Sequence, residues 1–203
     1  MPDTRYTIVA VIGYVLGSLS LSYIFSKMHG RDIRNEGTGA LGASNTTLSL
    51  GFKYGAAVAV HDILKAVMAV LIAEYVIMPE DLYAPYIAGT AAIIGHIFPA
   101  WLGFRGGKGF ACLIGFTAAI QPIFALCILL AALVVAFITD KIVAATTLWA
   151  IAFPVYFIIQ NEIIICAIIS VGSIVILLKH IPNYKKMIQG TEPSLRKSLG
   201  KQK

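Results

Sequence analysis

The sequence predicts an all-α integral membrane protein with seven transmembrane helices, and three observations lead to this fold class. Of the 203 residues, 58% are hydrophobic and only 13% are charged, whereas a soluble domain averages about 45–50% and about 25%. Apolar runs that can cross a bilayer follow one another along the chain, and the basic residues gather in alternate loops between them. A soluble fold of this size could not bury so much apolar surface, so we expect lipid to cover it.

The expected spans follow from the lengths of these runs, because a crossing helix needs about 20 apolar residues. The first run, residues 6–26, is longer than the apolar region of a signal peptide, so we expect it to be retained. One helix over residues 110–139 would be about 45 Å long. We divide it at Gln121-Pro122, because Pro disfavours helix at the preceding residue. The other expected spans are residues 54–78, 83–103, 142–159 and 163–178.

The distribution of charge predicts the orientation of these spans. With seven spans, all but two of the 16 Lys and Arg residues lie on the side of the C-terminus. The exceptions are Arg5 and Lys65, and Lys65 lies inside a span. The opposite loops, at residues 80–81 and 161–162, contain no Lys or Arg. The positive-inside rule therefore predicts an outer N-terminus and a cytoplasmic C-terminus.

We expect one membrane domain over residues 1–192 and a basic cytoplasmic tail over residues 193–203. Gly13 and Gly17 form a small-xxx-small face suited to close helix packing. The net charge of +6 is spread over short clusters rather than one basic face, so we expect no nucleic acid. The three cysteines lie inside apolar runs without zinc-site spacing, and no metal is predicted.

The first candidate site is the glycine-rich segment over residues 31–47, which contains a formal G-x-G-x-x-G. A dinucleotide-binding fingerprint needs a strand before it, and here an expected membrane helix precedes it. The glycines still allow backbone N–H groups to approach an anion. Ser44, Asn45 or Thr46 would lie at the N-terminus of the next helix, where phosphate is favoured. The alternative is an ordinary loop with a helix cap.

Two further segments carry candidate site residues. Gly106 and Gly107 stand between Arg105 and Lys108, and Gly109 follows the Lys, so the segment is not a Walker A loop. Its glycine density favours an anion cradle over a loop that serves only topology. The third segment is His180–Lys186, at the end of the last span, where we expect Pro182 to end the helix. His180 and Asn183 could donate hydrogen bonds there, or they could simply be helix-end residues.

Asp62 and Lys65 lie inside the second span at i and i+3, on one helix face where they can pair. A structural ion pair is the first interpretation, and a transport or substrate pathway is the alternative. His61 is expected to point elsewhere. The chain has no H-x-x-x-x-D, G-x-S-x-G or H-E-x-x-H pattern.

These segments together resemble the acyl-phosphate-dependent glycerol-3-phosphate acyltransferases, the PlsY family, in the right order and over nearly the whole chain. The residues that carry the resemblance are Gly17, Ser18, Asp32, Arg34, Gly37, Gly39, Gly42, Ala43, Ser44, Asn45, Gly51, Asp62, Lys65, residues 95–109, His180, Asn183 and residues 190–192. The segment over residues 95–109 is the most specific.

The chain departs from the family pattern at four positions. The family usually has Asn where Ala40 stands, Arg where Leu48 stands, Pro where Ser20 stands and Arg where Ile181 stands. The first two changes remove two phosphate or transition-state contacts. Each charge-assisted hydrogen bond is worth about 1.5–3 kcal/mol. Three outcomes are left open. Another residue such as Arg34 or Lys53 compensates, the activity is weak, or the substrates differ.

The resemblance implies transfer of a fatty acyl group from acyl phosphate to the 1-hydroxyl of glycerol 3-phosphate, giving lysophosphatidic acid for phospholipid synthesis. It implies a multi-pass protein of the plasma membrane with its site on the cytoplasmic face, and no cofactor or metal. The catalytic residues it implies are Ser44, Asn45, Lys108 and His180. The substrate-binding residues are Thr38, Gly39, Gly42, Arg105, Gly106, Gly107 and Asn183.

Two alternatives remain. One is a transporter or channel for a phosphorylated solute, and the other is a related acyltransferase with a different acceptor. A permeation path needs polar residues on both faces of the membrane, whereas here they cluster on one face.

Overall fold

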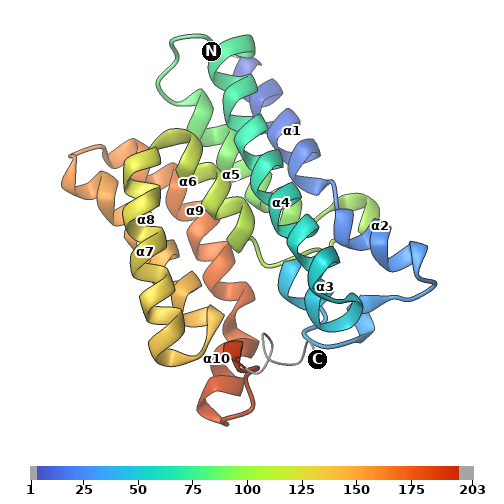
Figure 1. The fold of residues 1–203 in the computed structure, drawn as a ribbon. Helices are drawn as coiled ribbons and strands as arrows, with labels where there is room; N and C mark the ends of the chain where they lie inside the picture. Colours follow the sequence, from blue (N-terminus) through green and yellow to red (C-terminus); the bar gives the residue numbers. More distant parts are fainter. Residues whose placement is uncertain (1–3, 197–203) are drawn as a thin grey trace. The chain divides into compact units, whose positions relative to one another are not determined.

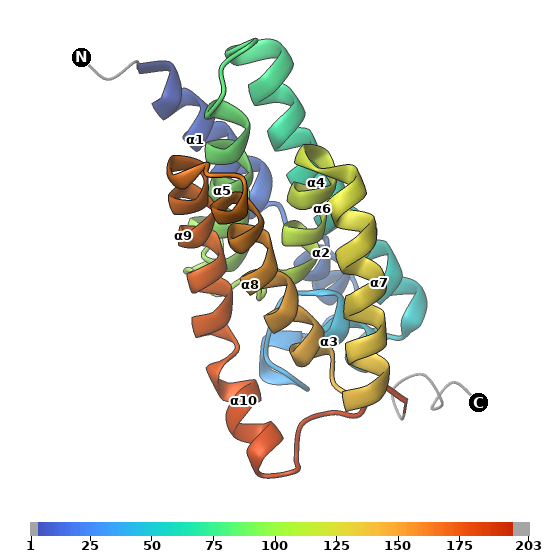
Figure 2. The same cartoon turned by 90° about the vertical axis from the view of Figure 1, so that its left-hand side faces the viewer.

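The computed structural model describes residues 4–196, and every regular element in that range is helical, as predicted. Figures 1 and 2 show these helices from two directions. The chain divides into two compact units, Met1–Ile120 and Gln121–Lys203.

The first unit is built around two long helices, α4 and α5, and carries the two glycine-rich segments in its connections. Its elements are α1 (Thr4–Ser18), α2 (Leu21–Met28), the 3₁₀ turn η1 (Ile33–Asn35), α3 (Ala43–Leu50), α4 (Phe52–Ile72) with its π-helical continuation η2 (Ala73–Ile77), α5 (Ala84–Ile97), the 3₁₀ turn η3 (Ala100–Leu102) and α6 (Phe110–Ile120).

The first apolar run forms two helices instead of one continuous helix, with a break between α1 and α2 that Figure 1 shows. The hydroxyl of Ser20 accepts a hydrogen bond from the Tyr23 N–H at 3.2 Å and caps the N-terminus of α2. A capping residue inside an apolar run is therefore the local cause of the break.

Small residues allow α1 and α5 to pack backbone against backbone, as the sequence predicted. A Cβ at Gly13 or Gly17 would overlap the backbone of Ala88 or Ala92 on α5. In return, a Cβ at Gly95 would overlap the backbone of Tyr14 on α1. This close approach places the end of α5, and the loop that follows it, beside the end of α1.

The second unit consists of α7 (Pro122–Thr139), α8 (Ile142–Ile159), α9 (Ile163–Lys179) and α10 (Ile181–Ile188). The division predicted at Gln121-Pro122 is confirmed, because α6 ends at Ile120 and α7 begins at Pro122. The expected helix end at Pro182 is wrong in detail. The chain bends by 44° between α9 and α10, and Pro182 lies in the first turn of α10, where its missing N–H costs nothing.

The described part of the expected tail is held by hydrogen bonds within the second unit. The Leu195 N–H donates to the Asp140 carbonyl at 3.0 Å, and the Arg196 N–H donates to the Asp140 carboxylate at 2.9 Å. Residues 197–203 lie outside the described residues, so the division into a domain and a tail stays a prediction.

Five helical stretches among the described residues are long and apolar enough to cross a membrane. They are Thr4–Met28, Phe52–Ile77, Ala84–Leu102, Pro122–Thr139 and Ile142–Ile159, and the bent pair α9 and α10 makes a sixth if counted as one span. The apolar helix α6 has 11 residues, about 16 Å at 1.5 Å per residue. That is shorter than a hydrocarbon core of about 30 Å. The structure supports a multi-pass membrane protein with five or six spans by length.

Candidate functional site

The first glycine-rich loop is folded around the side chain of Asn45, which is 1% exposed. The Asn45 amide oxygen accepts the Thr38 N–H at 2.7 Å, and its Nδ2 donates to the Ile33 carbonyl at 2.7 Å. Gly37 has a φ of 54°, and a Cβ there would overlap the Asn45 amide oxygen. Asn45 thus lies inside the loop and holds its shape. The sequence had predicted a catalytic role for Asn45 beside phosphate at the N-terminus of the helix, and that role stays a prediction.

The expected helix N-terminus is present, since α3 begins after Gly42. Its three polar residues differ in solvent exposure. Thr46 is fully buried and donates to the Gly42 carbonyl at 3.0 Å, whereas Ser44 is exposed in the first helical turn. Gly39 is also exposed. Ser44 is therefore the member of this set that can meet a ligand from outside.

The second glycine-rich loop, residues 103–109, turns back along the end of α5. The Gly106 N–H donates to the Ile97 carbonyl at 3.2 Å, and the Gly107 N–H donates to the His96 carbonyl at 3.0 Å. The Leu41 N–H of the first loop donates to the Gly106 carbonyl at 3.2 Å. The two glycine-rich loops therefore form one connected surface, with Arg105 exposed and Lys108 half-buried.

A buried charged cluster lies behind these loops and confirms the predicted Asp62–Lys65 pair. The Lys65 Nζ is 2.7 Å from the Asp62 carboxylate, and both side chains are less than 5% exposed. The same Nζ lies 2.9 Å from His96 Nδ1 and 2.7 Å from the Leu19 carbonyl. The expectation that His61 points elsewhere is wrong, because its Nδ1 lies 3.4 Å from the Asp62 carboxylate.

Asp62, His96 and Cys112 bring three potential metal-ligand atoms within 4.8 Å of one another. Sequence spacing gave no sign of this group, because its members come from α4, α5 and α6. The Lys65 ammonium already contacts both Asp62 and His96. A lysine cation thus takes the place that a metal ion would need.

Two ion pairs shape the outer edge of the first loop. The Arg34 guanidinium donates to both Asp32 carboxylate oxygens, with the shortest distance at 2.7 Å. These hydrogen bonds lower the pKa of the Asp32 carboxyl from 3.8 to about 2. Arg31 makes a similar pair with Glu36 at 2.6 Å. Arg34 is therefore already neutralised, which leaves the exposed Lys53 as the better of the two expected replacements for a lost arginine.

The third predicted segment lies in the second unit, where α9 meets α10. His180 is 6% exposed, and its Nδ1–H donates to the Ile176 carbonyl at 2.8 Å. Asn183 is equally buried, and its Nδ2 donates to the Glu192 carboxylate at 2.7 Å. The Lys141 ammonium donates to the Glu192 carbonyl at 2.6 Å. Sequence analysis named Glu192 only as part of a resemblance, and the structure makes it the partner that orients Asn183.

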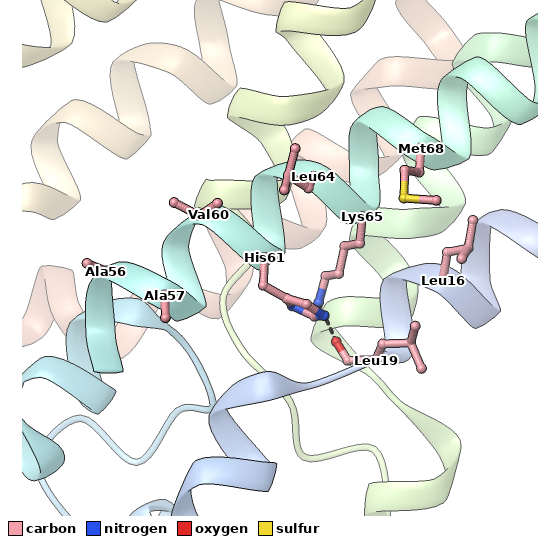
Figure 3. Close-up of a pocket in the computed structure, with 9 residues that line it drawn as sticks. All are labelled: Leu16, Leu19, Ala56, Ala57, Val60, His61, Leu64, Lys65 and Met68. Carbon is pink, nitrogen blue, oxygen red and sulfur yellow. Dashed lines mark hydrogen bonds between the residues drawn. The ribbon is translucent and has the colours of Figure 1, made fainter. Parts of the chain in front are cut away.

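An apolar groove of about 660 Å³ runs along α4 beside the break between α1 and α2, as Figure 3 shows. Its lining residues are Leu16, Leu19, Ala56, Ala57, Val60, His61, Leu64, Lys65 and Met68. In Figure 3 the polar ends of His61 and Lys65 point toward the Leu19 carbonyl. The groove is therefore apolar along its length and polar at the helix break.

These features define a polytopic helical membrane protein whose first unit carries two linked, glycine-rich loops suited to an anionic ligand. The family model described as glycerol-3-phosphate acyltransferase matches residues 7–190. The chain therefore belongs to the glycerol-3-phosphate acyltransferase family.

Individual relatives agree with this assignment. A "Glycerol-3-phosphate acyltransferase" of Clostridioides difficile (strain 630) is 37% identical over 92% of this chain and 94% of its own length. One of Allorhizobium ampelinum is 34% identical over 97% of this chain and 99% of its own.

Two solved structures are similar in fold. A crystal structure of PlsY (YgiH), an integral membrane glycerol 3-phosphate acyltransferase in its glycerol 3-phosphate form, matches with a TM-score of 0.83 and 29% identity. It covers 93% of this chain and 94% of that one. The lysophosphatidic acid form matches with a TM-score of 0.84 and 27% identity, over 96% and 98% of the two chains.

Proposed function

We propose that this protein transfers a fatty acyl group from an acyl phosphate to the 1-hydroxyl of glycerol 3-phosphate. The observation that carries the proposal is the hydrogen bond between Leu41 and Gly106, which joins two glycine-rich loops into one surface in a member of this family. Both substrates carry phosphate, and backbone N–H groups and basic side chains on such a surface suit phosphate oxygens.

The chemistry needs no covalent intermediate, because the acyl phosphate is a mixed anhydride and is already activated. The 1-hydroxyl oxygen attacks the acyl carbonyl carbon, the bond from that carbon to the phosphate oxygen breaks, and inorganic phosphate leaves with the hydroxyl proton. Lysophosphatidic acid is the other product. Positioning of the two substrates and electrostatic stabilisation can then supply most of the rate.

The proposed roles follow the exposure of each side chain. Lys108 and Ser44 contact the reacting groups, and Lys108 is the principal cation for glycerol 3-phosphate. The residues proposed to line the phosphate sites with them are Thr38, Gly39, Gly42, Arg105, Gly106 and Gly107. Asn45 takes a positioning role, because its amide already holds the loop from inside.

His180 and Asn183, in the second unit, keep the catalytic and substrate-binding roles that the family pattern implies for them. The Nδ1–H of His180 is held by the Ile176 carbonyl, which directs the other ring nitrogen away from the helix. Asn183 is oriented by Glu192 in the same way. Fixed donors and acceptors of this kind suit the second substrate or the developing charge.

We propose seven spans, with the short helix α6 crossing as part of the protein interior. Five of its 11 residues are buried, namely Cys112, Leu113, Gly115, Phe116 and Thr117. The N-terminus would then be outside and the C-terminus cytoplasmic, as the basic loops require. The site would face the cytoplasm from the plasma membrane, within a domain of residues 1–192.

The test is an assay of the purified protein in detergent or lipid mesophase, with palmitoyl phosphate and glycerol 3-phosphate. Inorganic phosphate and lysophosphatidic acid should appear in equal amounts, and palmitoyl-CoA should not replace the acyl phosphate. Lys108→Ala should lower kcat/KM by about 10- to 100-fold, the value of one charge-assisted hydrogen bond. Lys27→Ala is the matched control, because Lys27 lies on α2 outside both loops.

Folded protein that yields neither product would contradict the proposal. Uptake of glycerol 3-phosphate into sealed vesicles without acylation would favour the transporter. Acylation of another phosphorylated alcohol would favour the acyltransferase with a different acceptor.

A further inference from the structure

We propose that Lys65, Asp62 and His96 are positioning residues that hold the second glycine-rich loop in the position needed to bind substrate. This inference rests on the proposed function for its kinetic consequence. The structural part, that the cluster holds the loop, stands on geometry alone. None of the three residues belongs to the surface proposed to contact substrate.

The Lys65 ammonium has a partner for each of its three hydrogens. These partners are the Asp62 carboxylate at 2.7 Å, the Leu19 carbonyl at 2.7 Å and His96 Nδ1 at 2.9 Å. An ammonium group only donates, so His96 Nδ1 must accept and the ring proton lies on Nε2. One side chain of α4 therefore fixes the end of α1 and the ring of His96 on α5.

The imidazole of His96 transmits this position to the loop. A Cβ at Gly107 would overlap the Nε2 end of the ring, so the loop backbone lies directly against it. The Gly107 N–H also donates to the His96 carbonyl at 3.0 Å. A shift or rotation of the His96 ring would therefore displace the loop backbone.

The end of α1 also holds the segment that leads into the second loop. The Tyr14 hydroxyl donates to the Phe98 carbonyl at 2.7 Å and accepts the Ala100 N–H at 3.0 Å. The indole N–H of Trp101 donates to the Ser18 carbonyl at 3.0 Å. The segment that enters the loop is thus attached to the end of α1, next to the Leu19 carbonyl that Lys65 binds.

Stability alone does not account for the arrangement. An apolar pair of similar volume usually serves a folded protein as well as a buried ion pair does. An apolar pair would not bind the Leu19 carbonyl or orient His96. The contribution specific to these charges is therefore the geometry of the loop.

The experiment compares Lys65→Met, the double variant Lys65→Met with Asp62→Leu, and the control Lys27→Met, which removes a lysine charge from α2 in the same unit. For each protein we would measure the melting temperature, hydrogen exchange of the peptide over residues 103–109, and KM and kcat for glycerol 3-phosphate. The double variant matters because Lys65→Met alone leaves a buried carboxylate without its main partner and is expected to unfold readily.

The expected result is that the double variant melts several degrees below the wild type, because the Leu19 carbonyl loses its partner. It should stay folded at the assay temperature and exchange the Gly106 and Gly107 amides faster. Its KM for glycerol 3-phosphate should rise by about 10- to 100-fold, as when the supports of a site are removed. The value of kcat should change less. Lys27→Met should match the wild type in every measurement.

Wild-type exchange in the double variant would overturn the structural part. Faster exchange with an unchanged KM would overturn the positioning role in the reaction. If the wild type itself gives no turnover, the proposed function fails, while hydrogen exchange still decides whether the cluster holds the loop. The two failures are therefore distinguishable.

Discussion

Replacement of Asn45 by Ala tests whether this residue holds the first loop or touches substrate. The change removes two hydrogen bonds of 2.7 Å, one from the Thr38 N–H and one to the Ile33 carbonyl. Each such bond contributes about 1 kcal/mol, and a buried group left without a partner costs about 1–3 kcal/mol more. Ile33 is fully buried, so we expect a total loss of about 3–5 kcal/mol.

A loss of this size should lower the melting temperature by about 6–20 °C for a chain of this length. The assay is a thermal melt of the detergent-solubilised protein, combined with turnover measured well below the melting temperature. Asn45→Asp should melt at least as low, because its second carboxyl oxygen would face the Ile33 carbonyl where an N–H now donates. Ser44→Ala is the neighbouring control, and it should lower kcat/KM with no change in melting temperature.

The reasoning would be refuted by an Asn45→Ala protein that melts within about 1 °C of the wild type and yet has no activity. That result would mean that the amide contacts the reacting groups and that the loop keeps its shape without it. The opposite pattern, low stability with a raised KM and a measurable kcat, would support the positioning role.

Three further predictions concern packing, charge and orientation. Gly17→Ala should destabilise the fold by about 1–3 kcal/mol, because its Cβ overlaps the backbone of α5, while Val15→Ala on the exposed face should melt almost normally. Asp32→Asn should cost less than about 1 kcal/mol in melts at neutral pH, since the pair with Arg34 is partly exposed. Because the folded pKa of Asp32 is depressed to about 2, that contribution is present above about pH 4 and is lost as the pH falls through 2, where variant and wild type should converge. Glu192→Ala should raise KM or lower kcat through the amide it orients, whereas Glu192→Gln should retain most activity, because it keeps an acceptor oxygen.

The division of the fold into helices was predictable where a local signal marks each end. Gln121-Pro122 ended α6 and began α7 as expected, because Pro acts on its own neighbours. The break after Ser18 was missed, although Ser20 is a good capping residue. Serine is common inside membrane helices, so an apolar run of the right length concealed its effect.

The loops of the site were predictable from their glycines, while the roles of single residues depended on burial that sequence does not give. Ser44 and Asn45 are adjacent and both polar, yet Ser44 is exposed and Asn45 is buried. The helical period places neighbours about 100° apart, so adjacent residues can differ in burial. Which one faced inward depended on the path of residues 33–38, and no local rule fixes that path.

Two features of the first unit, the helix break after α1 and the buried charges of α4, would each destabilise a membrane protein on its own. A helix break within a span leaves a carbonyl without an intrahelical partner, and lipid offers none. Buried charges in a span are equally expensive unless they are paired and hydrogen-bonded. Here the Leu19 carbonyl at the break accepts a hydrogen bond from Lys65, which is 46 residues away in sequence and is neutralised by Asp62. The break in the first span and the ion pair in α4 therefore stabilise one another. A change to either should displace the loop that packs against His96.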